Sequence, residues 1–297
     1  MRKRSFLALL GLGLVTSIGY TCDEYGITGI VEDNDLNIGI YDKSANKDMT
    51  EEVFNQTIDR VENVYKPIVR DLGGRLQVIR KWSDGTVNAY AQRSGSTYKV
   101  SMFGGLARHA TITPDGFAMV VCHEIGHHIG GAPKKGGWFG GSSWASNEGQ
   151  ADYWGAMKCM RRVFKDDNNE QIVASMTIPE LVKKQCADNF TTDDEQFLCQ
   201  RVAMAGKSLA YLFQALRKLP KAPDFATPDP KVVNSTDHNH PQPQCRLDTY
   251  YNGGLCDTAL DDGVSQRDPQ TGVCTRAAGY DLGKGARPLC WYKPKRI

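Results

Sequence analysis

The feature that most constrains the fold of this chain is an apolar run, residues 117–122, that leads directly into a pair of histidines. Every position of the run is apolar, so it predicts a helix that is covered by protein on all sides. His123 and His127 are four residues apart and therefore share one face of this helix, with Glu124 beside them. Two glycines and a proline at 130–133 are stop signals and predict where the helix ends.

Two imidazoles at this spacing can bind one Zn²⁺, and the carboxylate of Glu124 can reach a water held by the same ion. The pattern fixes only three residues, so on its own it fits a core helix with two histidines equally well. A zinc hydrolase also needs a third protein ligand. Glu148 can provide it from a second helix, which Ser146 is expected to cap.

Asp152 follows Glu148 at helical spacing, so both carboxylates project from the same face. A carboxylate one turn from a metal ligand is well placed to hold a zinc-bound histidine in the required tautomer. Two solvated acids on a surface helix would be the ordinary alternative. The small and apolar neighbours between residues 151 and 156 favour a buried helix instead.

Together, His123-Glu124-x-x-His127 and Glu148-x-x-x-Asp152 resemble the motifs of the gluzincin metallopeptidases. The surroundings are similar to the HtpX-like and CAAX prenyl protease-like zinc endopeptidases. This resemblance covers roughly residues 50–250, and its further segments are 88–91, 98–106, 113–117 and His240-Pro241 with Arg246 downstream. The chain departs from that family in three ways: it has no transmembrane helices around the core, a Gly- and Trp-rich insertion, and a Cys-rich tail.

The resemblance implies an α+β fold with a gluzincin-type core, which consists of an active-site helix, a return helix and a small antiparallel sheet. It implies one Zn²⁺ per chain, held by His123, His127 and Glu148. Glu124 would act as the general base in the hydrolysis of a peptide bond. The substrate, a peptide or an unfolded protein, would lie extended along an edge strand at residues 97–103.

The resemblance also implies a second catalytic group, because gluzincins commonly supply a further donor to the oxyanion from a later segment. The candidates here are His238 and His240, and the proline after His240 and Arg246 six residues on favour the latter. Arg246 would help to fix that segment, and Asp152 would orient one metal-bound histidine. From the Pro-rich composition of residues 220–241 alone, both histidines would be solvated loop residues.

Two other classes of function fit parts of the sequence. One is an envelope quality-control or chaperone-like protein whose zinc is mainly structural. Glu124 argues against it, because a purely structural site needs no general base between its histidines. The other is a zinc hydrolase that acts on a non-peptide bond, which motif spacing does not exclude.

Residues 1–19 are typical of a secretory signal peptide: a basic start precedes an apolar run that is too short to span a bilayer. An uncleaved anchor is the alternative. We expect a zinc metallopeptidase domain at 20–241 and a disulfide-stapled, Cys-rich C-terminal module at 242–297. The protein would be exported to the periplasm or secreted, with no transmembrane segment in the mature chain.

The nine cysteines fit an oxidising compartment. Cys122, in the apolar helix, is expected to be a small core residue rather than part of a bridge. Cys186 and Cys199 flank a short polar loop and form a plausible pair. The four cysteines of the tail allow three connectivities, which the sequence leaves open; they are Cys245, Cys256, Cys274 and Cys290.

The charge balance of the chain gives no indication of a nucleic-acid partner. Three of the 36 Lys and Arg residues lie in the signal segment, which leaves 33 against 34 Asp and Glu, a net charge of −1. Apolar spacing predicts amphipathic helices at 51–69 and 193–219. Residues 75–82 and 97–103 are typical of strands, and the second segment alternates apolar and polar residues.

Overall fold

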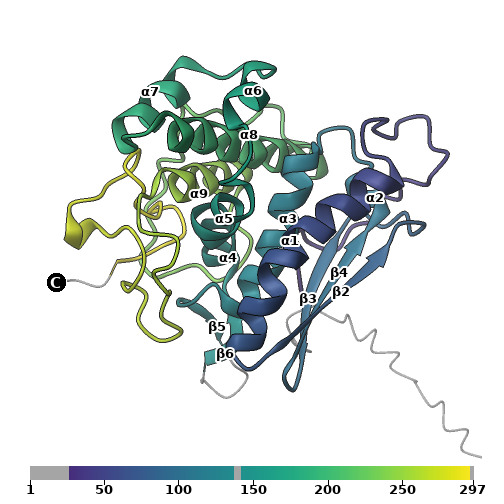
Figure 1. The fold of residues 1–297 in the computed structure, drawn as a ribbon, viewed down its shortest axis with the longest axis horizontal. Coiled ribbons are helices and arrows are strands. Elements are labelled where there is room, and N and C mark those ends of the chain that lie inside the picture. The colour runs from purple at the N-terminus through teal and green to yellow at the C-terminus, as the bar shows by residue number, and fades with distance from the viewer. Residues whose placement is uncertain (1–26, 137–141, 295–297) are drawn as a thin grey trace, which may run out of the picture.

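Helix α3 (Pro114–Ile129) carries both histidines and lies at the centre of the computed structural model, which describes residues 27–136 and 142–294 (Figure 1). All residues of α3 from Gly116 to Ile129 are buried, as the apolar run predicts. The hydroxyl of Thr113 caps its start by accepting the backbone N–H of Gly116 at 3.0 Å. Gly130 ends the helix, which confirms the predicted stop.

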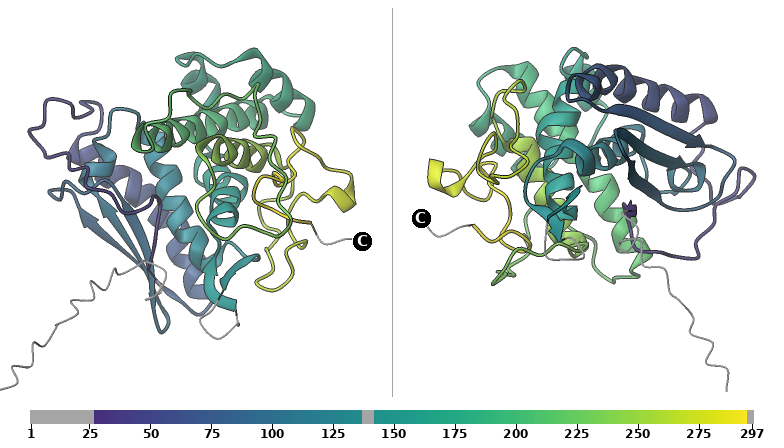
Figure 2. Two further views of the ribbon diagram at one scale, coloured as in Figure 1. Left: turned by 180° about the vertical axis from the view of Figure 1, so that it is seen from behind. Right: turned by 90° about the horizontal axis from the view of Figure 1, so that it is seen from below.

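A four-stranded sheet lies on one side of α3, together with helix α1 (Glu51–Asp71) (Figures 1 and 2). The strand order is β1-β3-β4-β2. The strands are β1 (Ile27–Gly29), β2 (Arg75–Lys81), β3 (Ala89–Ser94) and β4 (Thr97–Phe103). Strands β3 and β4 form an antiparallel hairpin whose turn requires the left-handed backbone of Gly95, with φ of 57°.

Two expectations about this sheet are wrong. Strand β4 pairs with β3 on one side and, in parallel, with β2 along its whole length on the other. The sheet is therefore mixed rather than antiparallel, and the strand at 97–103 is an inner strand. Because both rows of its backbone groups are already bonded, β4 has no free edge on which an extended peptide could pair.

The return helix is continuous from Glu148 to Phe164 but changes its winding. It consists of α4 (Glu148–Trp154), the π-helical segment η1 (Gly155–Met160) and α5 (Arg161–Phe164). Asn147, and not Ser146, caps it by accepting the backbone N–H of Gln150 at 2.9 Å. Ser146 is instead the last residue of a strand, so its side chain bonds the carbonyl oxygen of Gly131.

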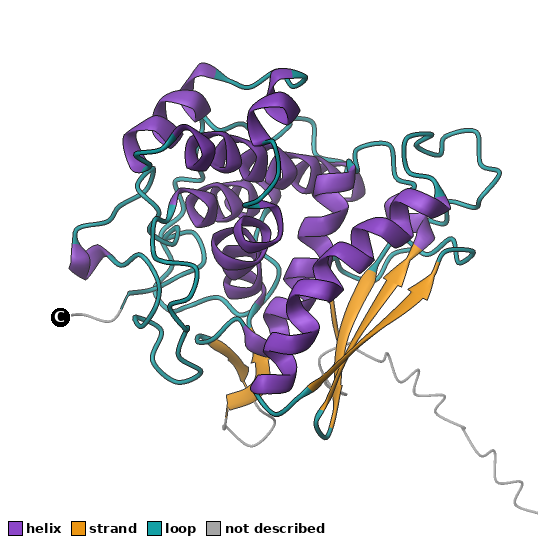
Figure 3. Ribbon diagram, viewed as in Figure 1, coloured by secondary structure: helices purple, strands orange, loops and turns teal. Residues whose placement is uncertain are grey.

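Helices and loops make up most of the fold on the other side of α3, and Figure 3 distinguishes helices, strands and loops by colour. The remaining elements are α2 (Gly104–Ala107), β5 (Lys134–Gly136), β6 (Ser142–Ser146), α6 (Asn169–Ala174), α7 (Glu180–Asn189), α8 (Asp193–Leu216), α9 (Pro243–Leu255) and η2 (Arg276–Ala278). Strands β5 and β6 form a separate antiparallel pair after α3. Within the described residues no helix is both long and apolar enough to cross a membrane. The predicted signal peptide lies outside those residues.

The C-terminal residues share the core of the preceding part of the chain. Helix α9 packs against α8 and α4. Tyr250 and Trp291 belong to the same buried cluster as Phe117 of α3. The indole of Trp291 lies where a Cβ on Gly149 would be, only 2.3 Å from its nearest atom, so the tail presses directly on the start of α4. The core is thus continuous across the predicted boundary between 241 and 242.

Four disulfides link the described residues: Cys122–Cys159, Cys186–Cys199, Cys245–Cys290 and Cys256–Cys274. The pair Cys186–Cys199 is confirmed, and the tail adopts one of the three open connectivities. The expectation that Cys122 stays unbridged is wrong. Its helix packs so closely on η1 that the Cα atoms of Cys122 and Cys159 are 5.6 Å apart, which suits a disulfide.

Removing the long-range tail disulfide should destabilise the protein more than removing the short one. Cys245–Cys290 closes a loop with a sequence separation of 45, against 13 for Cys186–Cys199. Each is expected to contribute about 2–4 kcal/mol, with the longer loop ahead by ~1 kcal/mol on chain entropy. Denaturant unfolding of the two double Cys→Ser variants measures this. Equal stability of the two variants, or a larger loss from removing Cys186–Cys199, would contradict the prediction.

Candidate metal centre

Three side chains from two helices meet at the centre of the molecule. The Nε2 atoms of His123 and His127 are 3.0 Å apart, and Oε2 of Glu148 lies 3.3 Å from the first and 3.7 Å from the second. All three side chains are fully buried. Ligand atoms at ~2.1 Å from a tetrahedral ion are separated by roughly 3.4 Å, so the spacing fits. These three residues could hold one metal ion, as the sequence predicts.

The outer nitrogens of the two rings determine where the inner lone pairs point. Nδ1 of His123 lies 2.7 Å from Oδ1 of Asp152, and Nδ1 of His127 lies 2.8 Å from the carbonyl oxygen of Ser146. Both oxygens can only accept, so both rings donate from Nδ1 and each neutral ring carries a lone pair on Nε2. Two lone pairs at this separation repel each other unless a cation lies between them. A metal ion or a proton between the two Nε2 atoms would remove this repulsion.

A proton competes for the same position. Burial lowers the pKa of His123, but the neighbouring carboxylates, first Asp152, raise it to about 9. Burial dominates at His127 and holds its pKa well below the usual value. A metal ion would have to displace the proton from the pair, so its affinity should fall at acidic pH.

Asp152 is held in place from three sides. Nε and Nη2 of Arg246 each donate to one of its oxygens at 2.8 Å, and the hydroxyl of Tyr250 donates to Oδ1. Burial raises the pKa of Asp152, but Arg246 and His123 outweigh it and hold that pKa below the usual value. Arg246 also donates to the carbonyl oxygen of Ile30 at 2.6 Å. In the structure, Arg246 thus holds the carboxylate of Asp152 that accepts from Nδ1 of His123.

We expect Asp152→Asn to weaken metal binding by about 10–100-fold, the usual effect of losing a carboxylate that orients a ligand histidine. The reason is that an amide can present its N–H₂ to Nδ1 and disturb the tautomer of His123. Competition with a chromophoric chelator measures the affinity. Asp248→Asn is a matched control, because Asp248 is also a buried acid of this region but bonds Gln244 and the Asp229 backbone. Equal affinities in the two variants would contradict the role of Asp152.

Both glutamates of the centre lack hydrogen-bond partners within the described residues, but Glu148 makes ion-pair contacts with Lys135 and the histidines, whereas Glu124 makes none there. Glu124 is fully buried, and neither of its oxygens has a partner within the described residues. Burial raises its pKa to about 8, although His123 lowers it. Orphaned buried carboxylates are costly and rare in folded proteins. A group maintained at such a cost is best explained by what it does rather than by what it stabilises.

Lys135 is part of the centre, although the sequence did not predict a role for it. Its Nζ lies 3.0 Å from Oε1 of Glu148, while Oε2 faces the histidines. Burial raises the pKa of Glu148, but His240 and Lys135 hold it well below the usual value. Lys135 thus occupies one carboxylate oxygen and leaves the other for an ion. No local signal distinguishes it from Lys134 beside it, since only the β5–β6 pairing brings it here.

The Pro-rich stretch returns to the centre, as the resemblance implies. Nε2 of His240 lies 3.3 Å from Oε2 of Glu148 and 2.8 Å from the carbonyl oxygen of Gly29. His240 is not part of the three-residue ligand group. His238 is exposed, and its Nδ1 lies 3.3 Å from the amide nitrogen of Asn147. The structure therefore separates the two candidates and brings only His240 into contact with a predicted ligand.

His128 is packed away from the ligand group, between the stacked rings of Tyr98 and Trp144. Its Nε2 donates to the carbonyl oxygen of Lys99 at 3.1 Å. Part of the Gly- and Trp-rich insertion, residues 137–141, lies outside the described residues. The chain matches no family model, no curated protein and no solved structure, so its own geometry is what assigns the centre.

Proposed function

We propose that this protein is a zinc endopeptidase of the gluzincin type, similar to the HtpX-like and CAAX prenyl protease-like enzymes. The observation that carries the proposal is the buried, unpartnered carboxylate of Glu124 beside the group His123, His127 and Glu148. Two imidazoles and one carboxylate at tetrahedral spacing suit Zn²⁺ with a fourth position for water. Bound Zn²⁺ would polarise the scissile carbonyl and acidify that water.

Glu124 would take the proton of the attacking water and pass it to the leaving amine. Burial raises the pKa of this carboxyl group to about 8. A divalent cation between the histidines would lower that pKa and keep the carboxylate ionised and ready to accept. Asp152 would hold the ring of His123, and His240 would donate to the oxyanion that forms on the carbonyl.

The substrate would be a peptide or an unfolded protein, cleaved outside the cytoplasm. Four disulfides fit an oxidising compartment, and this supports export to the periplasm or beyond the cell through the predicted signal peptide. The proposal does not include pairing of the substrate with β4, because that strand is bonded on both sides.

One observation favours the alternative, a structural zinc site in an envelope quality-control or chaperone-like protein. The three candidate ligands and Glu124 are all 0% exposed, whereas a catalytic zinc must keep one position open to water or substrate. Against this, His240 and Lys135 connect the ligand group to solvent, with side chains 17% and 12% exposed.

Metal analysis combined with cleavage of a denatured, fluorescently labelled protein tests the proposal. We expect about one zinc per chain, and hydrolysis that a chelator abolishes and added Zn²⁺ restores. Glu148→Ala should lose most of the zinc together with the activity, because it removes a ligand. Folded, zinc-loaded protein that cleaves nothing but suppresses aggregation of the same substrate would support the alternative instead.

A further inference from the structure

Arg287 is a buried cation in the C-terminal tail that bonds only neutral groups. Its side chain is 2% exposed, Nη1 donates to Oε1 of Gln150 at 3.0 Å, and Nη2 donates to the carbonyl oxygen of Pro269. Its Nε has no hydrogen-bond partner. Within the described residues it makes no ion pair, because no carboxylate oxygen lies within 4.0 Å of its side-chain nitrogens. Since arginine stays charged in proteins, this charge lacks a close counter-ion.

Asp268 is not a close counter-ion of Arg287, and acts on it only through its electrostatic field. Its oxygens accept from the backbone N–H of Gln270 and from the hydroxyl of Thr271. Arg287 also lies with its guanidinium carbon 3.8 Å from the ring centre of Tyr292, which keeps the planar group in one orientation. The cation is therefore held in one orientation and has no close counter-ion within the described residues.

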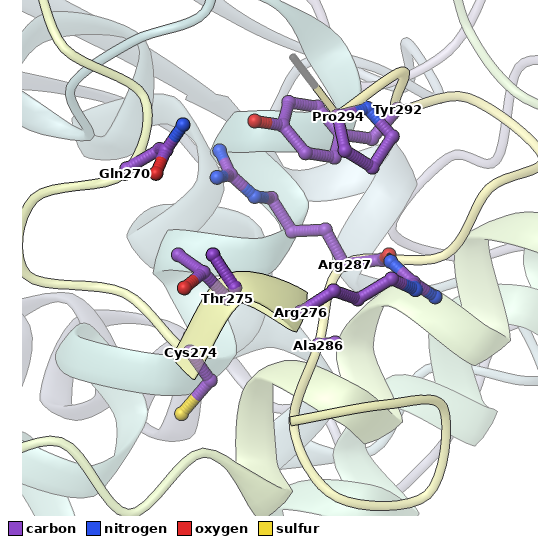
Figure 4. A pocket seen from close by; sticks show the side chains of 9 residues that line it. Gln270, Cys274, Thr275, Arg276, Ala286, Arg287, Tyr292 and Pro294 are labelled. Carbon is purple, nitrogen blue, oxygen red and sulfur yellow. The ribbon is translucent and has the colours of Figure 1, made fainter. Parts of the chain in front are cut away.

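A cavity of about 140 Å³ opens beside this guanidinium (Figure 4). A second arginine, Arg276, lines it and donates to the carbonyl oxygen of Arg287 at 2.8 Å. The acid that pairs with Arg276 is Asp281, at 3.3 Å and 73% exposed, where water screens its charge. Two cations thus border one small cavity in which the described residues place no carboxylate.

The rest of the cavity wall is partly polar and partly apolar. Figure 4 shows Gln270, Arg287 and Tyr292 around the same hollow, with Thr275 below them. Ala286 and Pro294 add apolar surface on the wall. A ligand that satisfies both kinds of surface carries one negative group for the arginines and a short apolar part for the remainder.

We propose that this cavity binds a small organic carboxylate, with Arg287 and Arg276 as its charge partners. A carboxylate can accept two parallel N–H bonds from one guanidinium, and the buried Nε of Arg287 has no partner within the described residues. Inorganic anions would meet the same charges but would leave the apolar wall uncovered. The site lies apart from the metal centre and does not depend on the proposed function.

Thermal unfolding of the full protein with sodium butyrate as the probe tests this inference. We expect a saturable rise in melting temperature, because a ligand that binds only the folded state stabilises it. Butyramide, the neutral isostere, and sodium chloride at the same ionic strength should produce no such rise. Arg276→Gln should weaken butyrate binding by on the order of tenfold or more, since it removes a charged hydrogen-bond donor.

Arg267→Gln is the matched control, because Arg267 is an exposed arginine in a neighbouring loop and does not line the cavity. It should bind butyrate like the wild type. Arg287→Met should abolish binding; if that variant does not fold, Arg276→Gln decides the test alone. The inference is overturned if the wild type shows no saturable shift, if butyramide or chloride acts equally well, or if Arg276→Gln binds butyrate unchanged.

Discussion

Glu124→Gln should keep its zinc and lose hydrolysis by on the order of 10²–10⁴-fold in kcat, the usual contribution of a positioned general base. The metal should stay because Glu124 is not one of the three ligands. The fold should also tolerate the change, because glutamine has nearly the same shape and neither oxygen of Glu124 has a hydrogen-bond partner to lose. Zinc content and kcat, measured on the same preparation, give the two numbers.

Glu62→Gln is a suitable control for this prediction. Glu62 is also a buried glutamate, 5% exposed, but it lies on α1 and pairs with Arg80 and Lys66. This variant should be less stable and yet retain the full kcat once folded. Comparable hydrolysis by Glu124→Gln and the wild type would remove Glu124 from the mechanism, whatever the zinc content.

The parts of the fold that the sequence predicts correctly are those governed by local spacing. The helix around His123, the helix from Glu51 and the strand at 97–103 follow from periodicity within about twenty residues. The neighbours of that strand do not, because strand pairing is set by contacts between distant segments. β2 is the outer strand beside β4, so the segment 97–103, which we expected at the edge of the sheet, is an inner strand. The bridge Cys122–Cys159 was missed for the same reason, since it depends on how two helices pack.

The candidate site shows the same division. Glu148 and Asp152 could be placed because the spacing of i and i+4 positions both carboxylates on one face of a helix. Lys135 and Tyr250 reach the centre from elements whose sequences contain no metal-binding pattern, so only the folded chain reveals them. His240 lies between these cases. Its own neighbourhood is typical of a solvated loop, and only the likeness to a family of enzymes singled it out.

His240→Ala should lower kcat by about 10²–10³-fold while leaving the zinc content intact, which is the usual effect of removing one oxyanion donor. The Nε2 atom is 2.8 Å from the carbonyl oxygen of Gly29 and 3.3 Å from Oε2 of Glu148. A substrate carbonyl oxygen bound next to Glu148 would therefore lie close to this N–H. Because His240 is outside the ligand group, its loss should affect the reaction rather than the metal.

His238→Ala is the matched control, because His238 lies two residues away in the same stretch but is exposed and contacts Asn147. It should retain both the zinc and nearly all of kcat. Unchanged turnover of His240→Ala would refute a catalytic role. His240 would then serve only to hold the Pro-rich stretch against β1 through its hydrogen bond to Gly29. Loss of zinc from His240→Ala, with zinc retained by Glu148→Ala, would instead make His240 the third ligand. Glu148 would then be a charged neighbour of the ion, held between Lys135 and the histidines.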